Sequence, residues 1–427
     1  MDMILEGKAF VNGSFEHCCI GISNGKILSI KKILKGDQHL IFKNKLLLPA
    51  AIDIHVHFRD PGMTAKEDFA TGSLAAAYGG TSCVCDMPNT LPATTTIQDI
   101  IKKKTLANRK SFVDFGVYAG ITDANSNSLS SLAQHCNGFK IYLGSSTNAL
   151  LLSPNKLMDV FYQASKVKKP LFIHAEDESC LLNHKKVEHT LADHLQGRPA
   201  VCEEQAIQKI LTASSSFLTP IHICHLSSCE GLELLKKRPT HITCGVTPHH
   251  TLLNAEQHFP SQSCYKVNPP LRTRLDKESL FDALAHDTID ILESDHAPHT
   301  LEEKQQEFDA APSGVPGVET MVPLFLYLTK KQQLSFQQMT SLLCARPGEI
   351  LAVPKGKLQP GYDADIMVVD LKKETKITAD MLHSKCGWTP FEKFPAIFPL
   401  HLFIRGEKLI EDREIQVSRG FGQYIGE

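Results

Sequence analysis

The stretch AIDIHVHFRDPG, residues 51–62, carries two histidines at the end of an apolar run and an arginine two residues further on. Side chains at positions i and i+2 of a strand point the same way, so His55 and His57 aim two imidazoles into one space. Imidazole is a frequent metal ligand, and this spacing suits a metal site. For this motif alone, two ordinary polar residues at a strand end remain an equal alternative.

Seven further short runs, rich in apolar and β-branched residues, follow with stretches of helical character between them. They are TSCVCDM (81–87), FVDFGVY (112–118), GFKIYLG (138–144), PLFIHA (170–175), IHICHL (221–226), HITCGVT (241–247) and IDILESD (289–295). Strands that alternate with helices in this way indicate strand–helix units and a parallel sheet. Eight units predict an α/β protein with a (β/α)₈ TIM-like barrel over residues 48–350, with its chemistry at the carboxyl ends of the strands.

Polar residues stand at these strand ends: His55, His57, Asp86, Lys140, His174, His225, His249 and Asp295. Each could be a hydrogen-bonded core residue when taken singly. Convergence of four histidines and the carboxylate of Asp295 on one barrel mouth predicts a metal centre. A lysine on a buried strand must pair, snorkel or lose its proton. A neutral Lys140 amine can react with carbon dioxide to a carbamate that bridges two cations, and an ordinary ion pair is the alternative.

The two ends of the chain share another pattern. Residues 1–47 alternate apolar and polar positions, with Asn-Gly pairs at 12–13 and 24–25 that indicate hairpin turns. The alternation returns in DADIMVVD (363–370) and HLFIRGEKLIEDREI (401–415). Since neither end can bury a face alone, we expect residues 1–47 and 351–427 to pair into one small β-sandwich.

The composition is that of a soluble globular protein: 427 residues, 42% hydrophobic and 22% charged, with a formal net charge of −2. This charge gives no reason to expect nucleic acid or an anionic membrane as a partner. The first residues lack the features of a signal peptide, and no apolar run approaches the roughly 18 residues of a membrane span, so we expect a cytoplasmic protein. The 13 cysteines include no CxxC pair. We expect them to be small buried apolar residues rather than disulfides or zinc ligands.

A set of motifs resembles the dihydroorotases of the amidohydrolase superfamily, in order along essentially the whole chain. They are HVHFRDPG (55–62), MPNT (87–90), GFKIYLG (138–144), FIHAED (172–177), HICHLSS (222–228), VNPPLRTR (267–274), SDHAPHTLEEK (294–304) and GVPGVET (314–320). The HxH and DHAP elements belong to the wider group of cyclic amidases. The arginine of HVHFR and the second histidine of DHAPH point to the dihydroorotases.

The resemblance implies a zinc enzyme with two ions per subunit. His55, His57 and Asp295 would hold one zinc, His174 and His225 the other, and a carboxylated Lys140 would bridge them. It also implies the reversible ring closure of N-carbamoyl-L-aspartate to L-dihydroorotate, the third step of pyrimidine biosynthesis, with Asp295 as the proton-transferring residue.

The substrate contacts follow from the same resemblance. Arg59, Asn89 and His299 would bind the substrate carboxylate, and Asn268 with the backbone of Ser313–Gly314 would hold the ring edge. A planar guanidinium matches a carboxylate with two parallel hydrogen bonds. As structural alternatives, Arg59 could pair with Asp60 or Glu67, and Asn89 could cap a turn.

Two other functions stay open. Hydantoinases, dihydropyrimidinases and allantoinases share the metal motifs, although allantoinases usually lack an arginine at the position of Arg59. A non-catalytic scaffold relative would have lost metal ligands, whereas all six are present here. A homodimer is the expectation from the family. Residues 300–313 could begin a solvated helix or form a lid.

Overall fold

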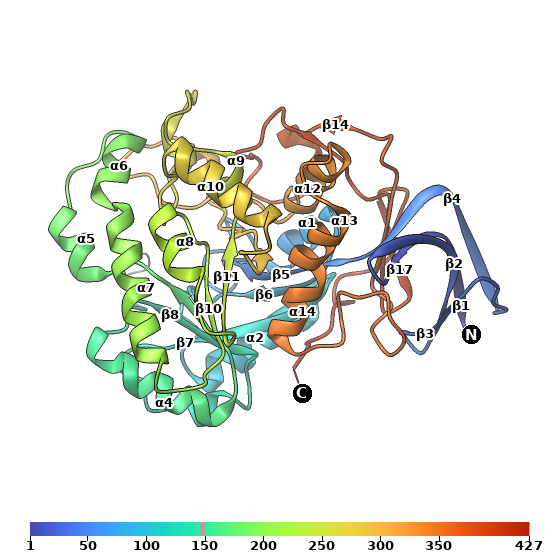
Figure 1. Cartoon of the computed structure of the whole chain (residues 1–427), viewed down its shortest axis with the longest axis horizontal. Coiled ribbons are helices and arrows are strands. Elements are labelled where there is room, and N and C mark those ends of the chain that lie inside the picture. The colour runs from blue at the N-terminus through green and yellow to red at the C-terminus, as the bar shows by residue number, and fades with distance from the viewer. Residues whose placement is uncertain (146–149, 427) are drawn as a thin grey trace.

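The computed structural model describes residues 1–145 and 150–426, and a barrel of eight parallel strands forms its centre (Figure 1). The strands are β5 (Ala51–Val56), β6 (Thr81–Asp86), β7 (Asp114–Gly120), β8 (Gly138–Tyr142), β9 (Leu171–His174), β10 (Ile221–Ile223), β11 (Ile242–Val246) and β12 (Ile291–Leu292). Neighbours in sequence are neighbours in the sheet, and a parallel bridge from Val56 to His296 closes the ring. The predicted barrel and its eight strands are therefore confirmed.

Apolar side chains fill the interior of this barrel. Ile52 and Ile54 of β5 meet Cys83 and Cys85 of β6 there, and Phe172 lies in the same cluster. Strands buried on both faces are apolar almost throughout, which is why their sequences show no clean alternation.

Helices surround the barrel (Figure 1). They are α1 (Phe69–Gly79), α2 (Ile97–Lys110), α3 (Leu129–Leu132), α4 (Leu157–Val167), α5 (Glu178–His184), α6 (Leu191–Gly197), α7 (Ala200–Ser214), α8 (Cys229–Leu235), α9 (Pro248–Leu252), α10 (Arg274–Ala285), α11 (Leu301–Lys304), α12 (Met321–Lys330), α13 (Phe336–Thr340) and α14 (Arg346–Leu351). Short 3₁₀ turns lie at Pro154–Lys156, Gln262–Tyr265 and Ala379–Met381, and a π turn at Ser341–Ala345.

Capping residues decide where several helices begin. Asp68 accepts the backbone N–H groups of Ala70 and Thr71 and starts α1. Thr300 and Glu303 form a capping box that starts α11. The polar segment after His299 thus begins as a helix, and a lid function for it stays a prediction.

Both ends of the chain build one eight-stranded sheet beside the barrel, in the order β18-β17-β16-β13-β4-β1-β2-β3 (Figure 1). Its strands are β1 (Met3–Val11), β2 (Ser14–Ser23), β3 (Lys26–Lys31), β4 (Gln38–Pro49), β13 (Ile366–Val369), β16 (His401–Ile404), β17 (Glu407–Glu411) and β18 (Glu414–Ile415); β14 (Thr375–Lys376) and β15 (Pro395–Ala396) pair separately. Asn12, Gly13, Asn24 and Gly25 have positive φ, as the type I′ hairpin turns predicted there require. The expected union of the two ends is confirmed, and the limits at residues 47 and 350 stay predictions.

A buried lysine connects this sheet to the barrel. Lys355 Nζ lies 2.6 Å from Asp114 Oδ2 at the start of β7, and 2.9 Å from a carboxylate oxygen of both Asp363 and Asp365. One cation therefore neutralises carboxylates from both parts of the molecule.

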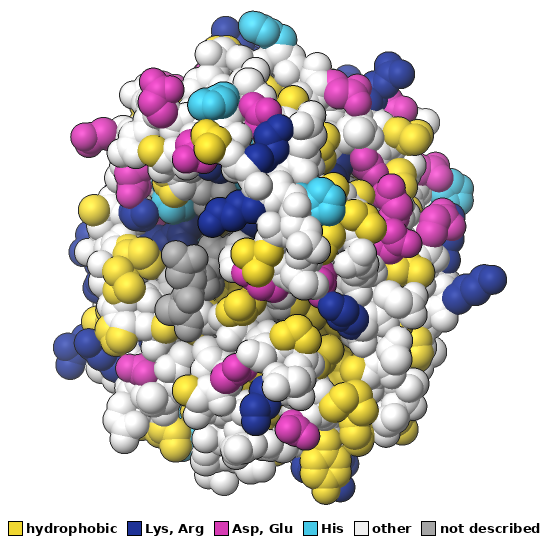
Figure 2. Space-filling model, turned by 90° about the vertical axis from the view of Figure 1, so that its left-hand side faces the viewer, with side chains coloured by type: hydrophobic (Ala, Val, Ile, Leu, Met, Phe, Trp, Pro, Cys, Tyr) yellow, Lys and Arg dark blue, Asp and Glu magenta, His cyan; other side chains and the backbone are white. Residues whose placement is uncertain are grey.

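The surface carries charges of both signs. On the face of the described residues seen in Figure 2, acidic and basic side chains are both spread over the surface. Among the described helices, none has the length and apolar character needed to cross a membrane.

Candidate active site

A cavity of about 480 Å³ opens at the carboxyl ends of the barrel strands. All twelve residues predicted to bind metal or substrate line it: His55, His57, Arg59, Asn89, Lys140, His174, His225, Asn268, Asp295, His299, Ser313 and Gly314. A larger cavity of about 720 Å³ lies where the strands begin and contains none of them. In barrel enzymes the chemistry takes place at the carboxyl ends, so the smaller cavity is the candidate active site.

The first donor group surrounds Asp295. Its Oδ1 lies 3.4 Å from His55 Nε2 and 3.0 Å from His57 Nε2. The other ring nitrogens are engaged, because His57 Nδ1 donates to Asn89 Oδ1 at 2.5 Å and His55 Nδ1 donates to Glu293 Oε2 at 3.0 Å. Both Nε2 lone pairs consequently face Asp295, the orientation that cation binding needs.

The second donor group joins β9 to the end of β10. His174 Nδ1 lies 3.1 Å from His225 Nε2, while His174 Nε2 donates to Glu176 Oε2 at 2.9 Å. The two groups adjoin, since His55, His225 and Asp295 each offer a ligand atom within 4.8 Å of the others. The residues could therefore hold a pair of neighbouring cations.

Burial sets the protonation of these ligands. It lowers the pKa of His57 to about 3 and holds the pKa values of His174 and His225 below the usual histidine range. Burial alone would raise the pKa of Asp295, but His55 and His57 beside it keep that pKa well below its usual value. Neutral imidazoles and an ionised carboxylate are the forms that bind a metal ion.

Lys140 lines the same cavity as the donor groups and is 1% exposed. Its Nζ is 3.3 Å from Cys224 Sγ and 5.1 Å from the ring centre of Tyr142. Within the described residues no carboxylate lies at ion-pair distance from this amine, so the ordinary ion pair considered as the alternative is not found there.

Two polar residues at predicted strand ends stay outside the cavity. Asp86 accepts the N–H of Phe58 and pairs with Lys103 Nζ at 2.6 Å, so it supports the fold. His249 lies in α9 rather than at the end of β11, because Thr247 caps a helix directly after that strand.

The backbone is left-handed at three site residues. The φ angles are 61° at Arg59, 40° at His225 and 43° at Asp295. Non-glycine residues seldom adopt this region, and such conformations concentrate at functional sites. Here they occur at or just after strand ends, where the chain turns away and its side chain stays over the cavity.

Two hydrogen-bond donors face each other beside the metal ligands. Lys66 Nζ donates to His299 Nδ1 at 3.0 Å, which assigns the ring proton to Nε2, and that N–H donates to Ser313 O at 3.1 Å. Arg59 Nη2 lies 3.2 Å from the same Nε2. Burial, then Arg59 and Lys66, lower the pKa of His299, so the ring is neutral. An anion bound here would accept from Arg59 Nη2 and would share the His299 N–H with Ser313 O.

The structural alternatives for Arg59 are not seen. Asp60 pairs with Lys110 at 2.7 Å, and Glu67 lies 3.4 Å from His296. The Arg59 side chain instead donates from Nε to Pro298 O at 3.2 Å and is buried at the cavity wall.

Asn268 and the Ser313–Gly314 backbone line the same cavity. Asn268 Oδ1 is buried and has no hydrogen-bond partner among the described residues. The N–H of Gly314 already donates to Lys266 O at 2.9 Å, and Ser313 O accepts from His299 at 3.1 Å.

Three residues of the site escaped the sequence analysis. Glu293 and Glu176 accept hydrogen bonds from His55 and His174, and Tyr142 lines the cavity. Each lies two positions from a predicted metal ligand. The alternation of side chains along a strand was the signal that could have found them.

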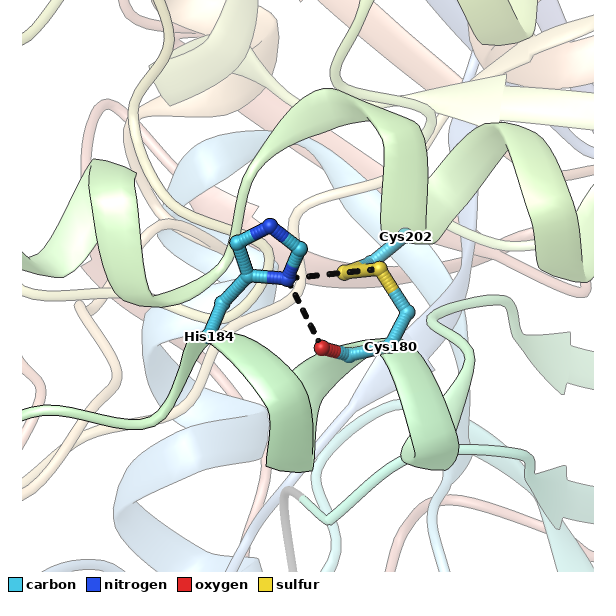
Figure 3. A group of neighbouring side chains, drawn as sticks. All are labelled: Cys180, His184 and Cys202. Carbon is cyan, nitrogen blue, oxygen red and sulfur yellow. Dashed lines mark hydrogen bonds between the residues drawn. A yellow bond between two sulfur atoms is a disulfide. The ribbon is translucent and has the colours of Figure 1, made fainter.

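One expectation about the cysteines is wrong. Cys180 of α5 and Cys202 of α7 form a disulfide, with His184 Nδ1 3.8 Å from Cys180 Sγ and 2.9 Å from the carbonyl of the same residue (Figure 3). The two cysteines are 22 residues apart, and packing of α5 against α7 brings them together, so no local spacing could indicate the pair. The other eleven cysteines are free, and most are buried as expected.

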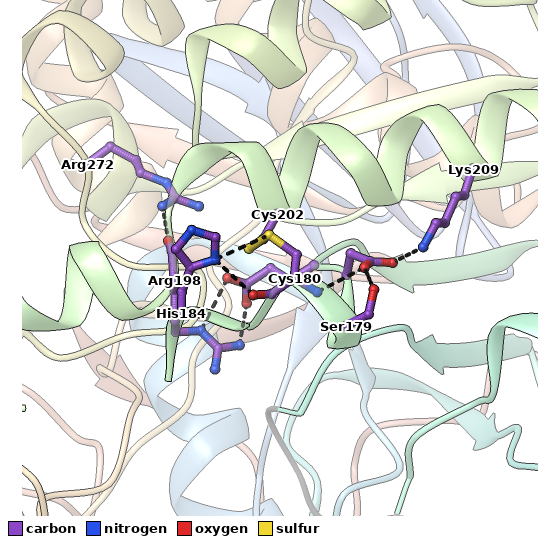
Figure 4. The surroundings of a disulfide bond; sticks show 9 residues. Ser179, Cys180, His184, Arg198, Cys202, Lys209 and Arg272 are labelled. Carbon is purple, nitrogen blue, oxygen red and sulfur yellow. Dashed lines mark hydrogen bonds and ion pairs between the residues drawn. A yellow bond between two sulfur atoms is a disulfide. The ribbon is translucent and has the colours of Figure 1, made fainter. Parts of the chain in front are cut away.

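The disulfide encloses a segment that supports the second donor group. Arg198, within this segment, donates from Nη2 to Glu176 Oε2 at 2.5 Å and from Nη1 to Ser145 O at 3.0 Å. Arg272 in turn donates to the backbone carbonyl of Arg198 (Figure 4). Glu176 thus connects the enclosed segment to the ring of His174.

Fold and site together define a barrel hydrolase built for amide bonds. Residues 46–390 match the model of the Amidohydrolase family, and the chain belongs to that family. Its relatives narrow the assignment. Dihydroorotase from Methanosarcina acetivorans is 38% identical over 98% of this chain and 94% of its own length. Dihydroorotase from Thermoplasma volcanium is 39% identical over 100% of this chain and 98% of its own length. The chain therefore groups with the dihydroorotases, hydrolases of cyclic amides.

Solved structures agree on the fold. The L-hydantoinase (dihydropyrimidinase) from Arthrobacter aurescens has a TM-score of 0.94 at 26% identity, covering 100% of both chains. The dihydropyrimidinase from Brevibacillus agri has a TM-score of 0.91 at 21% identity and covers 100% of this chain and 98% of its own.

Proposed function

We propose that the protein is a dihydroorotase that interconverts N-carbamoyl-L-aspartate and L-dihydroorotate, the third step of pyrimidine biosynthesis. The observation that carries this choice is the pair of donors on Arg59 and His299, 3.2 Å apart beside the metal ligands. Dihydroorotate has a ring carboxylate that fits between such donors. The neutral rings of dihydrouracil and hydantoin have none.

The donor set fits two zinc ions. His55, His57 and Asp295 would hold one, and His174 with His225 the other, since imidazole and carboxylate are typical zinc ligands. Bound zinc lowers the pKa of water to about 7 and polarises carbonyl groups. We propose that Lys140 is carboxylated and bridges the two sites, because its buried amine shares the cavity with both donor groups and has no carboxylate partner within the described residues.

Asp295 is the proposed proton carrier. Its low pKa keeps it ionised at neutral pH, and its Oδ1 faces the centre of the first donor group. In the hydrolytic direction this carboxylate accepts a proton from the attacking water and delivers it to the departing ring nitrogen. During ring closure the same carboxylate accepts the proton from the attacking nitrogen and delivers it to the departing water.

The remaining residues orient the ring. Arg59, His299 and the free amide group of Asn89 bind the carboxylate, because Asn89 Oδ1 already accepts from His57. Asn268 Oδ1 accepts a ring N–H, and the carbonyl oxygens of Ser313–Gly314 flank the same edge. Arg59 Nη2, the Asn89 amide and Asn268 Oδ1 have spare hydrogen-bonding capacity, and the His299 N–H would be shared with Ser313 O.

Other cyclic amidases form the second candidate class. The likeness to hydantoinases in fold favours them, whereas a neutral ring leaves Arg59 Nη2 without an anionic acceptor. A non-catalytic scaffold is disfavoured because the six proposed ligands converge on one cavity. A homodimer and a cytoplasmic location belong to the same proposal and remain predictions.

Turnover of a substrate panel tests the function. Initial rates would be measured on L-dihydroorotate, dihydrouracil, hydantoin and allantoin with zinc-loaded protein. We expect the largest kcat/KM for dihydroorotate, and a preference for any neutral ring would contradict the proposal. Elemental analysis and intact mass in bicarbonate buffer would report the zinc content and the carboxylation of Lys140 separately.

A further inference from the structure

Tyr142 carries a buried hydroxyl group that the proposed mechanism does not use. It lies on β8 two positions after Lys140, so both side chains point to the same face of the strand. The side chain lines the cavity and is 3% exposed. Its hydroxyl is buried and has no hydrogen-bond partner among the described residues. Buried polar groups nearly always have partners, so a missing partner points to a ligand.

The Tyr142 side chain lies beside the proposed metal ligands. Its ring is 5.8 Å from the His174 ring and 5.1 Å from Lys140 Nζ. It lines the same cavity as Asp295 and Arg59. A phenol keeps its proton at neutral pH, so this hydroxyl can act as a hydrogen-bond donor.

We infer that Tyr142 is a further catalytic residue whose hydroxyl donates a hydrogen bond to the oxygen of the ring carbonyl under attack. The inference rests on the proposed function. In dihydroorotate a single ring carbon separates this carbonyl from the carbon that bears the carboxylate. A donor in the same cavity as Asp295 and Arg59 can therefore reach that edge of the ring. Arg59 and His299 already supply donors to the carboxylate, which leaves the carbonyl oxygen for Tyr142.

The contact would strengthen during the reaction. When water adds to the amide carbon, the C=O double bond becomes single and its electron pair moves onto the oxygen. A donor already aimed at that oxygen stabilises the transition state more than the bound substrate, and loss of one such donor costs on the order of 100-fold in kcat.

A second buried tyrosine provides the matched control. Tyr118 of β7 is fully buried in the barrel interior, and its hydroxyl donates to Ile54 O at 3.1 Å. It does not line the candidate active site. Tyr118→Phe removes the same oxygen from a neighbouring strand without touching the substrate.

The experiment compares Tyr142→Phe with Tyr118→Phe in zinc-loaded protein. Both kcat and KM would be measured on L-dihydroorotate and on dihydrouracil, together with zinc content and melting temperature. For Tyr142→Phe we expect kcat to fall roughly 100-fold on both rings, with KM and zinc content nearly unchanged. For Tyr118→Phe we expect kcat within about threefold of wild type, since an interior hydroxyl contributes to stability alone.

Three outcomes would overturn the inference: an unchanged kcat in Tyr142→Phe, a loss confined to dihydroorotate (a carboxylate contact), or a loss that follows zinc content. Failure of the proposed function is distinguishable, because the wild-type protein would then leave dihydroorotate intact. In that case the kcat of Tyr142→Phe on the cyclic amide that the wild type does hydrolyse decides the inference.

Discussion

At the scale of single residues, Glu293 serves both donor groups with one carboxylate. Oε2 accepts from His55 Nδ1 at 3.0 Å, and Oε1 accepts from the backbone N–H of His225 at 2.5 Å. Gly245 leaves room for it, since a Cβ there would come within 2.6 Å of Oε1. Burial would raise the pKa of Glu293, but His55 and His222 hold it well below its usual value. Glu293 therefore stays an acceptor on both sides.

The variant Glu293→Gln tests this positioning. The glutamine amide has the same shape and can accept from one of the two N–H groups, of His55 or of His225. Its NH₂ group then faces the remaining N–H, so two donors meet there. We expect zinc affinity, measured by titration against a chelator, to fall about 10- to 100-fold. The matched control is Glu319→Gln, since Glu319 is also buried and holds His383 Nδ1 at 2.8 Å outside the cavity. Equal zinc affinity in both variants would refute the role of Glu293.

Arg59 decides between acidic and neutral substrates. Arg59→Lys keeps the charge but loses the planar, two-pronged geometry. Loss of a charge-assisted contact of this kind should cost on the order of 2–4 kcal/mol, or roughly 30- to 1,000-fold in kcat/KM for dihydroorotate. Zinc content and the slow hydrolysis of dihydrouracil should barely change. Equal losses on both rings would mean that Arg59 supports only the fold.

At the scale of elements, the disulfide between α5 and α7 supports the second donor group. The disulfide encloses Arg198, which donates a hydrogen bond to Glu176. Glu176 in turn accepts a hydrogen bond from the ring of His174. Constraining such a segment reduces the entropy of the unfolded chain and so stabilises the fold.

Removal of the disulfide should therefore lower stability. For a loop of 22 residues, the free energy of unfolding should fall by about 3 kcal/mol on reduction, as measured by denaturant titration. Cys202→Ser should match the reduced wild-type protein and show no further response to dithiothreitol. A wild-type protein that is insensitive to dithiothreitol would argue against a formed disulfide.

At the scale of the whole molecule, a cluster around Lys355 joins the barrel to the terminal sheet. Lys355 is 3% exposed and contacts Asp114, Asp363 and Asp365. Burial would lower its pKa, but the carboxylates raise it well above the usual lysine value. A buried cation among carboxylates is costly to remove, since the opposite charges remain uncompensated.

Lys355→Met tests this junction. We expect the free energy of unfolding to fall by about 3–5 kcal/mol, because buried carboxylates lose their cation. Since the folded pKa of Lys355 is raised, this contribution is complete below the unfolded pKa near 10.5 and is lost only as the pH rises through the folded value. Lys357→Met is the control: Lys357 forms a surface pair with Glu349, and its loss should cost less than about 1 kcal/mol. Similar losses in the two variants would rule out a special role for the junction.

Local patterns were enough to predict the barrel, the hairpin turns and the metal-binding candidates at strand ends. The strands of the barrel and the turns at Asn12–Gly13 and Asn24–Gly25 follow from periodicity and backbone preference over a few positions. His55, His57 and Asp295 stand at strand ends, and parallel strands bring all their carboxyl ends to one edge. Asp86 and His249 were predicted by the same rule and lie outside the cavity, and the substrate contacts were predicted from the family resemblance rather than from local pattern.

Only the tertiary structure decided what those side chains contact. Glu293 meets His55 across 238 positions, Arg59 meets His299 across 240, and Lys355 meets Asp114 across 241. The Cys180–Cys202 disulfide and the unpartnered hydroxyl of Tyr142 likewise depend on which elements pack together. Such contacts leave no periodic trace in the sequence, because each depends on how separate elements pack against one another in the folded chain.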